Sequence, residues 1–208
     1  MRTTTHRLFR LALALAILAP GLAAQQSRQT IVVAGGCFWG IQNVFEHVKG
    51  VVSATSGYAG GSAGTAQYET VSDGGTGHAE SVKIVFDPGV VTLDKLLRVF
   101  FASHDPTQLN RQGPDVGSQY RSVIFYDGDE QKRAADAAIA ELAQSKTFPR
   151  PVVTQVTPLK GFFPAEAYHQ DYAVTHPTEP YIVYNDLPKV DHLRAKFPEL
   201  YREYPAKK

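Results

Sequence analysis

A single cysteine, Cys37, is the residue of this chain most suited to covalent chemistry, because it lies between a strand-like and a helix-like segment. A helix N-terminus presents unpaired N–H groups and a partial positive charge, which stabilise an anion such as a thiolate. Gly35 and Gly36 let the backbone turn sharply before it, so the sulfur can be presented there with a lowered pKa. A cysteine packed inertly beside two glycines fits the same residues equally well.

Two large aromatic residues, Phe38 and Trp39, follow the cysteine, and Trp39 is the only tryptophan in the chain. Successive helical residues point about 100° apart, so both cannot share the inner stripe with Ile41 and Val44. We therefore expect at least one of them to face Cys37, where it would exclude water and hold an apolar group. Core packing is the alternative, and for Phe38 alone it is favoured.

Hydrophobic periodicity predicts the elements that position these residues. Strands are predicted over residues 30–34, 51–58, 79–86, 120–126 and 151–159, and helices over residues 38–48, 93–104, 129–146 and 165–174. Residues 107–119 form a polar loop long enough to carry function. Strands and helices interleave without an internal repeat, which predicts one layered α/β-type domain with helices packed on a sheet.

Composition and charge exclude several classes of partner. The 208 residues are 43% hydrophobic and 20% charged, as in ordinary globular domains. With 21 basic and 20 acidic residues the net charge is +1, so neither nucleic acid nor an anionic membrane surface is indicated. The seven histidines show no ligand spacing, so no metal site is predicted, and we interpret His78 as structural.

Residues 1–24 have the pattern of a secretory signal peptide. Three arginines precede an apolar run over residues 11–19, and small residues follow it. The run is far shorter than the roughly 20 apolar residues of a spanning helix, so cleavage is favoured over an uncleaved anchor. We expect a mature catalytic domain of residues 25–208, periplasmic or secreted, without a membrane anchor. An exported chain with one cysteine cannot form an internal disulfide.

Five blocks resemble, in order, the motifs of the A-type peptide methionine sulfoxide reductases. They are GGCFWG (35–40), GYAGG (57–61), TGHAE (76–80), HDPTQLNRQGPDVGSQYRS (104–122) and FFPAEAYHQDY (162–172). The resemblance covers nearly the whole expected mature chain. The resemblance implies an α+β fold of two layers, a mixed sheet covered by helices, with a ferredoxin-like split βαβ core.

The resemblance also implies the roles of seven residues. Cys37 would be the nucleophile, and Phe38 and Trp39 would form the pocket for the methyl group on the sulfoxide sulfur. The implied polar site residues are Glu80, Tyr68, Tyr120 and Asp115. Each role is chemically reasonable, because a departing oxygen needs a protonated carboxyl and phenols can donate hydrogen bonds to it. Outside the resemblance, a solvated edge carboxylate, surface tyrosines and a turn-stabilising aspartate are the ordinary interpretations.

The implied activity is reduction of peptidyl and free methionine S-sulfoxide, which repairs oxidised proteins under oxidative stress. The S epimer comes from the resemblance alone, and no metal or organic cofactor is implied. Several family members carry resolving cysteines near the C-terminus, which this chain lacks. The Cys37 sulfenic acid should therefore be recycled by an external thiol, either a thioredoxin-like protein or a small thiol such as dithiothreitol. We expect a monomer, and we assign Gln42, where many relatives have glutamate, no catalytic role.

Two other functions remain open from the residues. A cysteine hydrolase could use Cys37 with His78 or His104, since nucleophile and base need only be close in space. A binding module could hold methionine-containing segments through Phe38 and Trp39. The C-terminal tail, residues 176–208, has no interpretable site motif and is predicted to wrap the domain through four aromatic residues, Tyr181, Tyr184, Phe197 and Tyr201.

Overall fold

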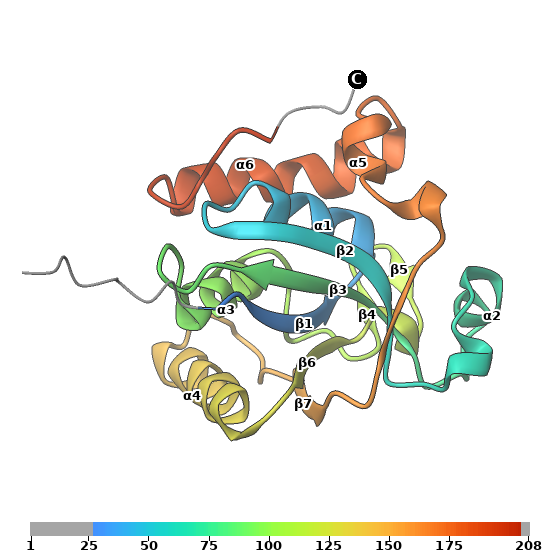
Figure 1. The fold of residues 1–208 in the computed structure, drawn as a ribbon, viewed down its shortest axis with the longest axis horizontal. Helices are drawn as coiled ribbons and strands as arrows, with labels where there is room; N and C mark the ends of the chain where they lie inside the picture. Colours follow the sequence, from blue (N-terminus) through green and yellow to red (C-terminus); the bar gives the residue numbers. More distant parts are fainter. Residues whose placement is uncertain (1–26, 205–208) are drawn as a thin grey trace, which may run out of the picture.

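A six-stranded mixed sheet runs through the middle of the structure (Figure 1). The computed structural model describes residues 27–204. The strands of this sheet are β1 Gln29–Gly35, β2 Val51–Ala59, β3 Ala79–Phe86, β6 Ser122–Tyr126, β7 Gln155–Pro158 and β8 Phe162–Pro164. Their order is β7-β6-β1-β3-β2-β8, and neighbouring strands are antiparallel except for the parallel pair β6 and β7.

Four central strands and two helices form a split βαβ core. The helices are α1 Phe38–Glu46 and α3 Leu93–Ala102. Helix α1 connects β1 to β2, and β3 lies between these two strands, while α3 connects β3 to β6 on the other side of β1. This topology confirms the predicted α+β fold with a ferredoxin-like core. It also places the start of α1, and Cys37, at the end of a central strand.

The apolar pattern of the sequence explains this packing. β1 is buried on both faces, with Ile31 and Val33 in the core under the helices and Val32 in a second cluster on the opposite face. The stripe predicted from the spacing consists of Ile41, Val44 and Phe45 on α1 and Val48 just after it, and each is at most 1% exposed. Burial of this stripe fixes the rotation of α1 and therefore the direction of its first turn.

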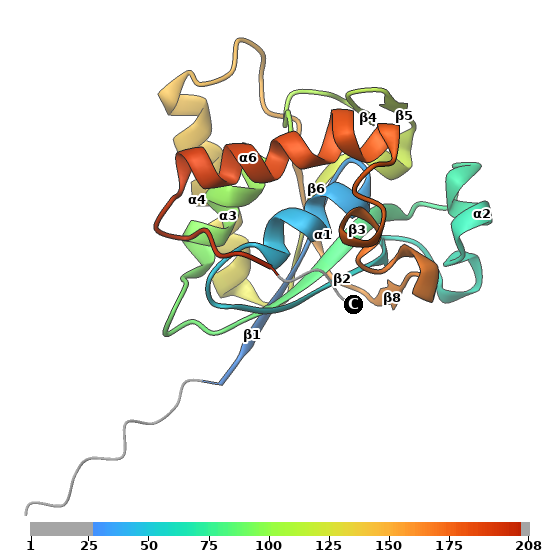
Figure 2. The ribbon, with the colours of Figure 1, turned by 90° about the horizontal axis from the view of Figure 1, so that it is seen from above.

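The remaining helices surround this core. Helix α4 (Asp129–Ser145) packs on α3, and α6 (Leu187–Lys196) lies along α1 (Figures 1 and 2). Two short helices, α2 (Tyr68–Ser72) and α5 (Tyr172–Thr175), and a small hairpin of β4 (Arg111–Gln112) and β5 (Asp115–Val116) lie near one end of the sheet (Figure 2). Tyr68 and Asp115, two of the polar residues predicted for the site, lie in these short elements.

Several segments differ from the predicted elements. The strand predicted over residues 151–159 forms only as β7, and the helix predicted over residues 38–48 ends at Glu46. Tyr120 lies in a 3-10 helix, Ser118–Tyr120, and strand β6 begins only at Ser122. Residues 165–174 do not form a continuous helix, because Asp171 has a positive φ of 56° that separates a 3-10 turn from α5. The C-terminal tail contains the unpredicted helix α6. Tyr184, expected to pack on the domain, is 79% exposed.

No helix within residues 27–204 is both long and apolar enough to cross a membrane. The predicted signal peptide, residues 1–24, lies outside the described residues.

Candidate active site

Cys37 is the N-cap residue of α1 and is buried, with 7% of its surface exposed. The chain enters this position through Gly36, whose φ of +95° is unfavourable for other residues. A Cβ at Gly36 would lie 2.6 Å from the Gln112 side chain, so β4 also covers this turn closely. The sulfur is thus fixed between the first turn of a helix and the β4–β5 hairpin.

Glu80 lies beside the cysteine on the same helix N-terminus. It projects from β3, is 2% exposed, and its Oε2 accepts a hydrogen bond from the backbone N–H of Phe38 at 3.1 Å. Burial raises the pKa of Glu80 to about 8, the charges of Asp115 and Asp186 act in the same direction, and the Phe38 N–H opposes them. The carboxyl is therefore protonated at neutral pH and can serve as an acid.

The thiol pKa contradicts the expectation from the helix N-terminus. Burial raises the pKa of Cys37 well above its usual value, and the nearby carboxyl groups of Glu80 and Asp186 add to this effect. The backbone N–H of Trp39 and the ammonium of Lys189 lower the pKa, but by less. Desolvation therefore outweighs the helix terminus, and the free protein holds Cys37 as a thiol.

Two phenols, those of Tyr68 and Tyr120, lie near Glu80. Tyr68 begins α2, and Tyr120 ends the 3-10 helix before β6. Burial, and next the charge of Glu80, raise the pKa of both tyrosines. The Tyr120 pKa also responds to Asp115 and Cys37. Both phenols therefore lie within electrostatic reach of Glu80 and Cys37, and their raised pKa values keep them protonated as hydrogen-bond donors.

Asp115 acts on the site through an aromatic neighbour. Its Oδ2 accepts a short hydrogen bond from the hydroxyl of Tyr181, and the Tyr181 ring meets Trp39 edge-on at 6.0 Å between centroids. Trp39 is also stacked on Tyr172 at 3.9 Å, and its Nε1–H donates to Nδ1 of His169 at 3.1 Å. The indole ring is thus held on three sides.

Phe38 and Trp39 differ in their surroundings. Phe38 is 1% exposed and packs between Tyr58 and His169, with ring centroids 5.9 and 5.1 Å apart respectively. Trp39 is only partly buried. The prediction that the two rings cannot share the inner stripe agrees with these contacts.

Several residues around the site were not predicted as site residues: Glu166, His169, Tyr172, Tyr181, Asp186 and Lys189. Tyr181 was expected only to pack the tail on the domain. The first three lie within the FFPAEAYHQDY block, so the motif itself was a usable signal. The other three come from the C-terminal tail, where no local pattern marks them. They reach the site only because the tail returns along α1.

The two histidines considered as bases for Cys37 have other hydrogen-bond partners. In His78, Nδ1 accepts from the Gly61 N–H at 3.2 Å and Nε2–H donates to the Ser62 carbonyl at 2.9 Å. In His104, Nδ1–H donates to the Phe100 carbonyl and Nε2 bonds to the Ser122 hydroxyl. Burial lowers the pKa of His104 to about 4. These contacts disfavour the hydrolase alternative.

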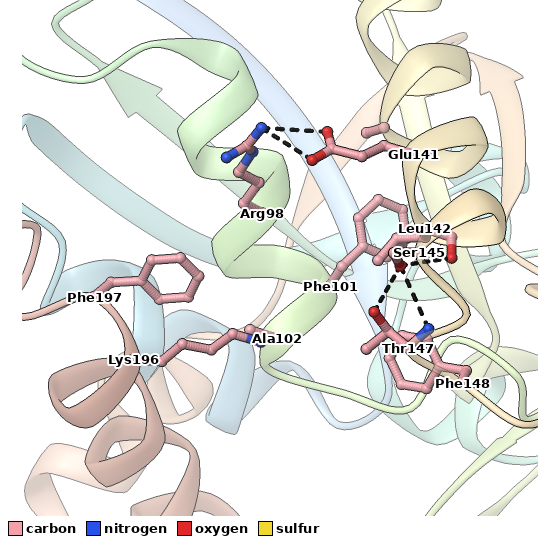
Figure 3. A pocket seen from close by; sticks show the side chains of 11 residues that line it. Arg98, Phe101, Ala102, Glu141, Leu142, Ser145, Thr147, Phe148, Lys196 and Phe197 are labelled. Atoms are coloured by element: carbon pink, nitrogen blue, oxygen red, sulfur yellow. Dashed lines mark hydrogen bonds and ion pairs between the residues drawn. The ribbon is translucent and has the colours of Figure 1, made fainter.

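A separate surface pocket lies between α3, α4 and the end of α6 (Figure 3). Its wall includes the Arg98–Glu141 ion pair and the rings of Phe101, Phe148 and Phe197. None of the site residues predicted from the sequence lines it. Cys37 and its polar neighbours, which combine a nucleophile with an acid, therefore remain the candidate active site.

Comparisons with known proteins agree with this geometry. The family model described as peptide methionine sulfoxide reductase matches residues 29–201. The chain is 56% identical over 183 residues to peptide methionine sulfoxide reductase MsrA 2 of Mesorhizobium japonicum, covering 88% of this chain and 94% of the relative.

Two solved structures share the fold. Methionine sulfoxide reductase A of Corynebacterium diphtheriae aligns with a TM-score of 0.66 and 33% identity, covering 75% of this chain and 78% of that one. Mxr1 from Saccharomyces cerevisiae in reduced form aligns with a TM-score of 0.67 and 32% identity, covering 73% and 87%.

Proposed function

The chain belongs to the peptide methionine sulfoxide reductase family, in its A type, and from this premise we propose how the Cys37 site works. The protein reduces methionine sulfoxide in proteins to methionine, and so repairs oxidative damage. One observation carries the assignment of roles. The nucleophile and a protonated carboxyl share the N-terminus of α1, because Cys37 caps the helix and Glu80 accepts from its first N–H.

The first half of the reaction transfers an oxygen atom. The Cys37 sulfur attacks the sulfoxide sulfur, and Glu80 delivers its proton to the sulfoxide oxygen as the S–O bond weakens. Tyr68 and Tyr120 donate hydrogen bonds to this oxygen while negative charge develops on it. The S–S bond made by the attack then breaks as the hydroxyl passes from the substrate sulfur to the Cys37 sulfur. The products are the methionine thioether and a Cys37 sulfenic acid, so two electrons pass from the cysteine to the substrate. Glu80 regains a proton from the thiol.

Trp39 and Phe38 hold the apolar end of the substrate. The indole ring is fixed by Tyr172, His169 and Tyr181, so its position does not depend on the substrate. A preformed apolar wall suits the methyl group on the sulfoxide sulfur, and orients the oxygen toward the acid. We propose that this orientation selects the S epimer of methionine sulfoxide.

The second half needs thiols from outside, because Cys37 is the only cysteine of the 208 residues. One thiol condenses with the sulfenic acid, which releases water and forms a mixed disulfide. A second thiol attacks this disulfide, releases Cys37 as a thiol and leaves the reductant as a disulfide. A thioredoxin-like dithiol is the partner that we propose, with dithiothreitol as a substitute in vitro.

Export to the periplasm, or secretion, is part of the same proposal. It is supported by the arginine-rich, apolar and small-residue pattern of residues 1–24. The net charge of +1 gives no support to a nucleic-acid partner. Mass analysis of the protein from the periplasmic fraction, with an N-terminus near residue 25, is the expected outcome. Full-length protein in the cytoplasm would contradict it.

A single-turnover reaction tests the chemistry. Protein lacking residues 1–24 is mixed with excess methionine S-sulfoxide without reductant, and methionine and protein mass are followed together. We expect about one methionine per chain and a dimedone-trapped sulfenic acid on Cys37. The R epimer should give none, and Cys37→Ser is the matched control. No methionine from folded protein would remove the proposed function, and equal binding of methionine and its sulfoxide would favour the binding module.

A further inference from the structure

An ion pair from the C-terminal tail is inserted against the first turn of α1. Asp186 precedes α6, and its Oδ1 lies 2.9 Å from Nζ of Lys189. The Asp186 side chain is fully buried, and that of Lys189 is 18% exposed. A buried pair of this kind carries a large desolvation penalty, so it needs a reason beyond stability.

The contact with α1 is made at Gly40, three residues after Cys37. A Cβ at Gly40 would lie 2.1 Å from Asp186 Oδ1 and 2.6 Å from Lys189 Nζ. The backbone of Gly40 is not in the positive-φ region, so conformation does not require glycine there. The glycine instead leaves room for the carboxylate and the ammonium beside the helix terminus.

The charged and titratable groups around the thiol are mostly acidic. They come from β3, β5, α2, the 3-10 helix before β6 and the tail: Glu80, Asp115, Tyr68, Tyr120, Tyr181, Asp186 and Lys189. The carboxyl groups of Glu80 and Asp186 raise the pKa of Cys37, whereas the Lys189 ammonium lowers it. Asp186 is the partner of this partly buried ammonium.

We propose that Lys189 is a positioning residue that acts through Cys37: its ammonium, held by Asp186 in the space left by Gly40, stabilises the thiolate that attacks the sulfoxide. Cys37 is a thiol in the free protein, and the reaction needs its anion. Lys189 reduces the free energy of that ionisation without touching the substrate. The inference rests on Cys37 being the nucleophile of the proposed reaction.

The test is the pH profile of Cys37 alkylation by iodoacetamide, which reports the thiolate and does not require reductase activity. In Lys189→Met the apparent pKa of alkylation should rise by about one unit, so that alkylation at a fixed lower pH slows about tenfold. Lys189→Arg should restore most of the rate. Lys196→Met, which removes a cation from the exposed last turn of the same helix, should match the parent protein.

A second comparison covers the case in which Lys189→Met does not fold because Asp186 is left without its partner. Asp186→Asn keeps an amide oxygen that can accept a hydrogen bond from the Lys189 ammonium in the same place. This variant and the double variant Asp186→Asn/Lys189→Met then differ only by the cation, and the double variant should be alkylated at the higher pKa. Equal alkylation profiles for Asp186→Asn and the double variant, or for the parent protein and Lys189→Met, would overturn the inference.

Single-turnover kinetics separate this inference from the proposed function. Lys189→Met should form methionine about tenfold more slowly, with an unchanged half-saturating sulfoxide concentration, because the ammonium does not bind the substrate. If the parent protein formed no methionine while the alkylation profiles still shifted, the function would fail and the electrostatic role would stand. If only the half-saturating sulfoxide concentration changed and the rate of methionine formation did not, Lys189 would be assigned to substrate binding and the inference would be overturned.

Discussion

The rate of the proposed reaction depends on the protonation state of Glu80. Its pKa of about 8 keeps the carboxyl neutral at pH 7, and its bond to the Phe38 N–H keeps it beside Cys37. Glu80→Gln preserves the size and one hydrogen-bond acceptor but cannot deliver a proton. We expect its single-turnover rate to fall roughly 10²- to 10⁴-fold. Glu130→Gln, on the exposed face of α4, should leave the rate unchanged.

The same carboxyl makes stability depend on pH with a defined sign. Glu80 titrates near its ordinary value of 4.5 when unfolded and at about 8 when folded. Between these values the unfolded chain releases the proton and the folded protein keeps it, so stability falls as pH rises through this window. The free energy of unfolding should drop by roughly 3–5 kcal/mol relative to Glu80→Gln between pH 4.5 and 8.

Urea unfolding of both proteins at pH 4.5, 6 and 8.5 measures this difference. The difference in free energy of unfolding between the parent protein and Glu80→Gln should widen up to about pH 8 and stay constant above it. A gap independent of pH would mean that Glu80 is ionised in the folded protein, and would remove it as the acid.

At the scale of elements, one carboxylate connects three segments of the site. Glu166, before a 3-10 turn, accepts from the Tyr58 hydroxyl of β2 at 2.9 Å and from the Tyr68 backbone N–H at the start of α2 at 3.0 Å. It therefore fixes where α2 begins and where the Tyr68 phenol points. Glu166 touches none of the reacting atoms, so its effect is one of position.

Glu166→Ala should therefore lower the single-turnover rate about tenfold, because a loosely held phenol stabilises the oxygen less well. In a Tyr68→Phe background the same change should have little further effect, since the hydroxyl that it positions is already absent. Glu69→Ala, the exposed neighbouring carboxylate on α2, serves as the control. Additive effects of the two changes would show that Glu166 acts elsewhere.

The elements were predictable where one periodicity dominates. The stripe of α1 and the β-branched run of β1 are buried on both sides of the Gly35–Gly36 turn, so the position of Cys37 followed from the sequence. The short segments that carry polar groups of the site could not be predicted in this way. Tyr120 lies in a 3-10 turn after Gly117, and Asp171 adopts a left-handed conformation that breaks the expected helix. Tertiary contacts, not local propensity, decide these short segments.

Gln42 illustrates the same limit. It was assigned no catalytic role, and it is 2% exposed. Its Oε1 accepts from the Ser56 hydroxyl of β2 and from the Asp171 N–H, while its Nε2 donates to the Ala54 carbonyl. The amide joins α1 to β2 and to the irregular turn that precedes Tyr172. The contact with Asp171 joins residues 129 positions apart, a separation that no local pattern can indicate.

At the scale of the whole molecule, the C-terminal tail completes the site. Helix α6 lies along α1 with Leu193 2% exposed, and the tail also supplies Tyr181, Asp186 and Lys189 (Figure 2). Leu193→Ala should destabilise the protein by about 2–4 kcal/mol through the cavity it leaves. Urea unfolding measures the change, and Val90→Ala, at a residue 58% exposed, should stay within about 0.5 kcal/mol.

Because the tail docks on α1 as a unit, Leu193→Ala should also expose Cys37 more often. If the tail opens locally, the rate of Cys37 alkylation in this variant should rise in proportion to the loss of stability. Unchanged alkylation with reduced stability would show that α6 leaves only on global unfolding.

The buried core described for the sheet and helices consists mainly of valine, isoleucine, leucine, alanine and aromatic residues. Residues 27–204 contain no methionine, since the only one in the chain is Met1. Thioethers are the flexible side chains that many proteins use to fill irregular gaps in a core, and their oxidation makes such cores polar. This fold contains none of them. A protein that repairs this lesion therefore cannot suffer it within residues 27–204.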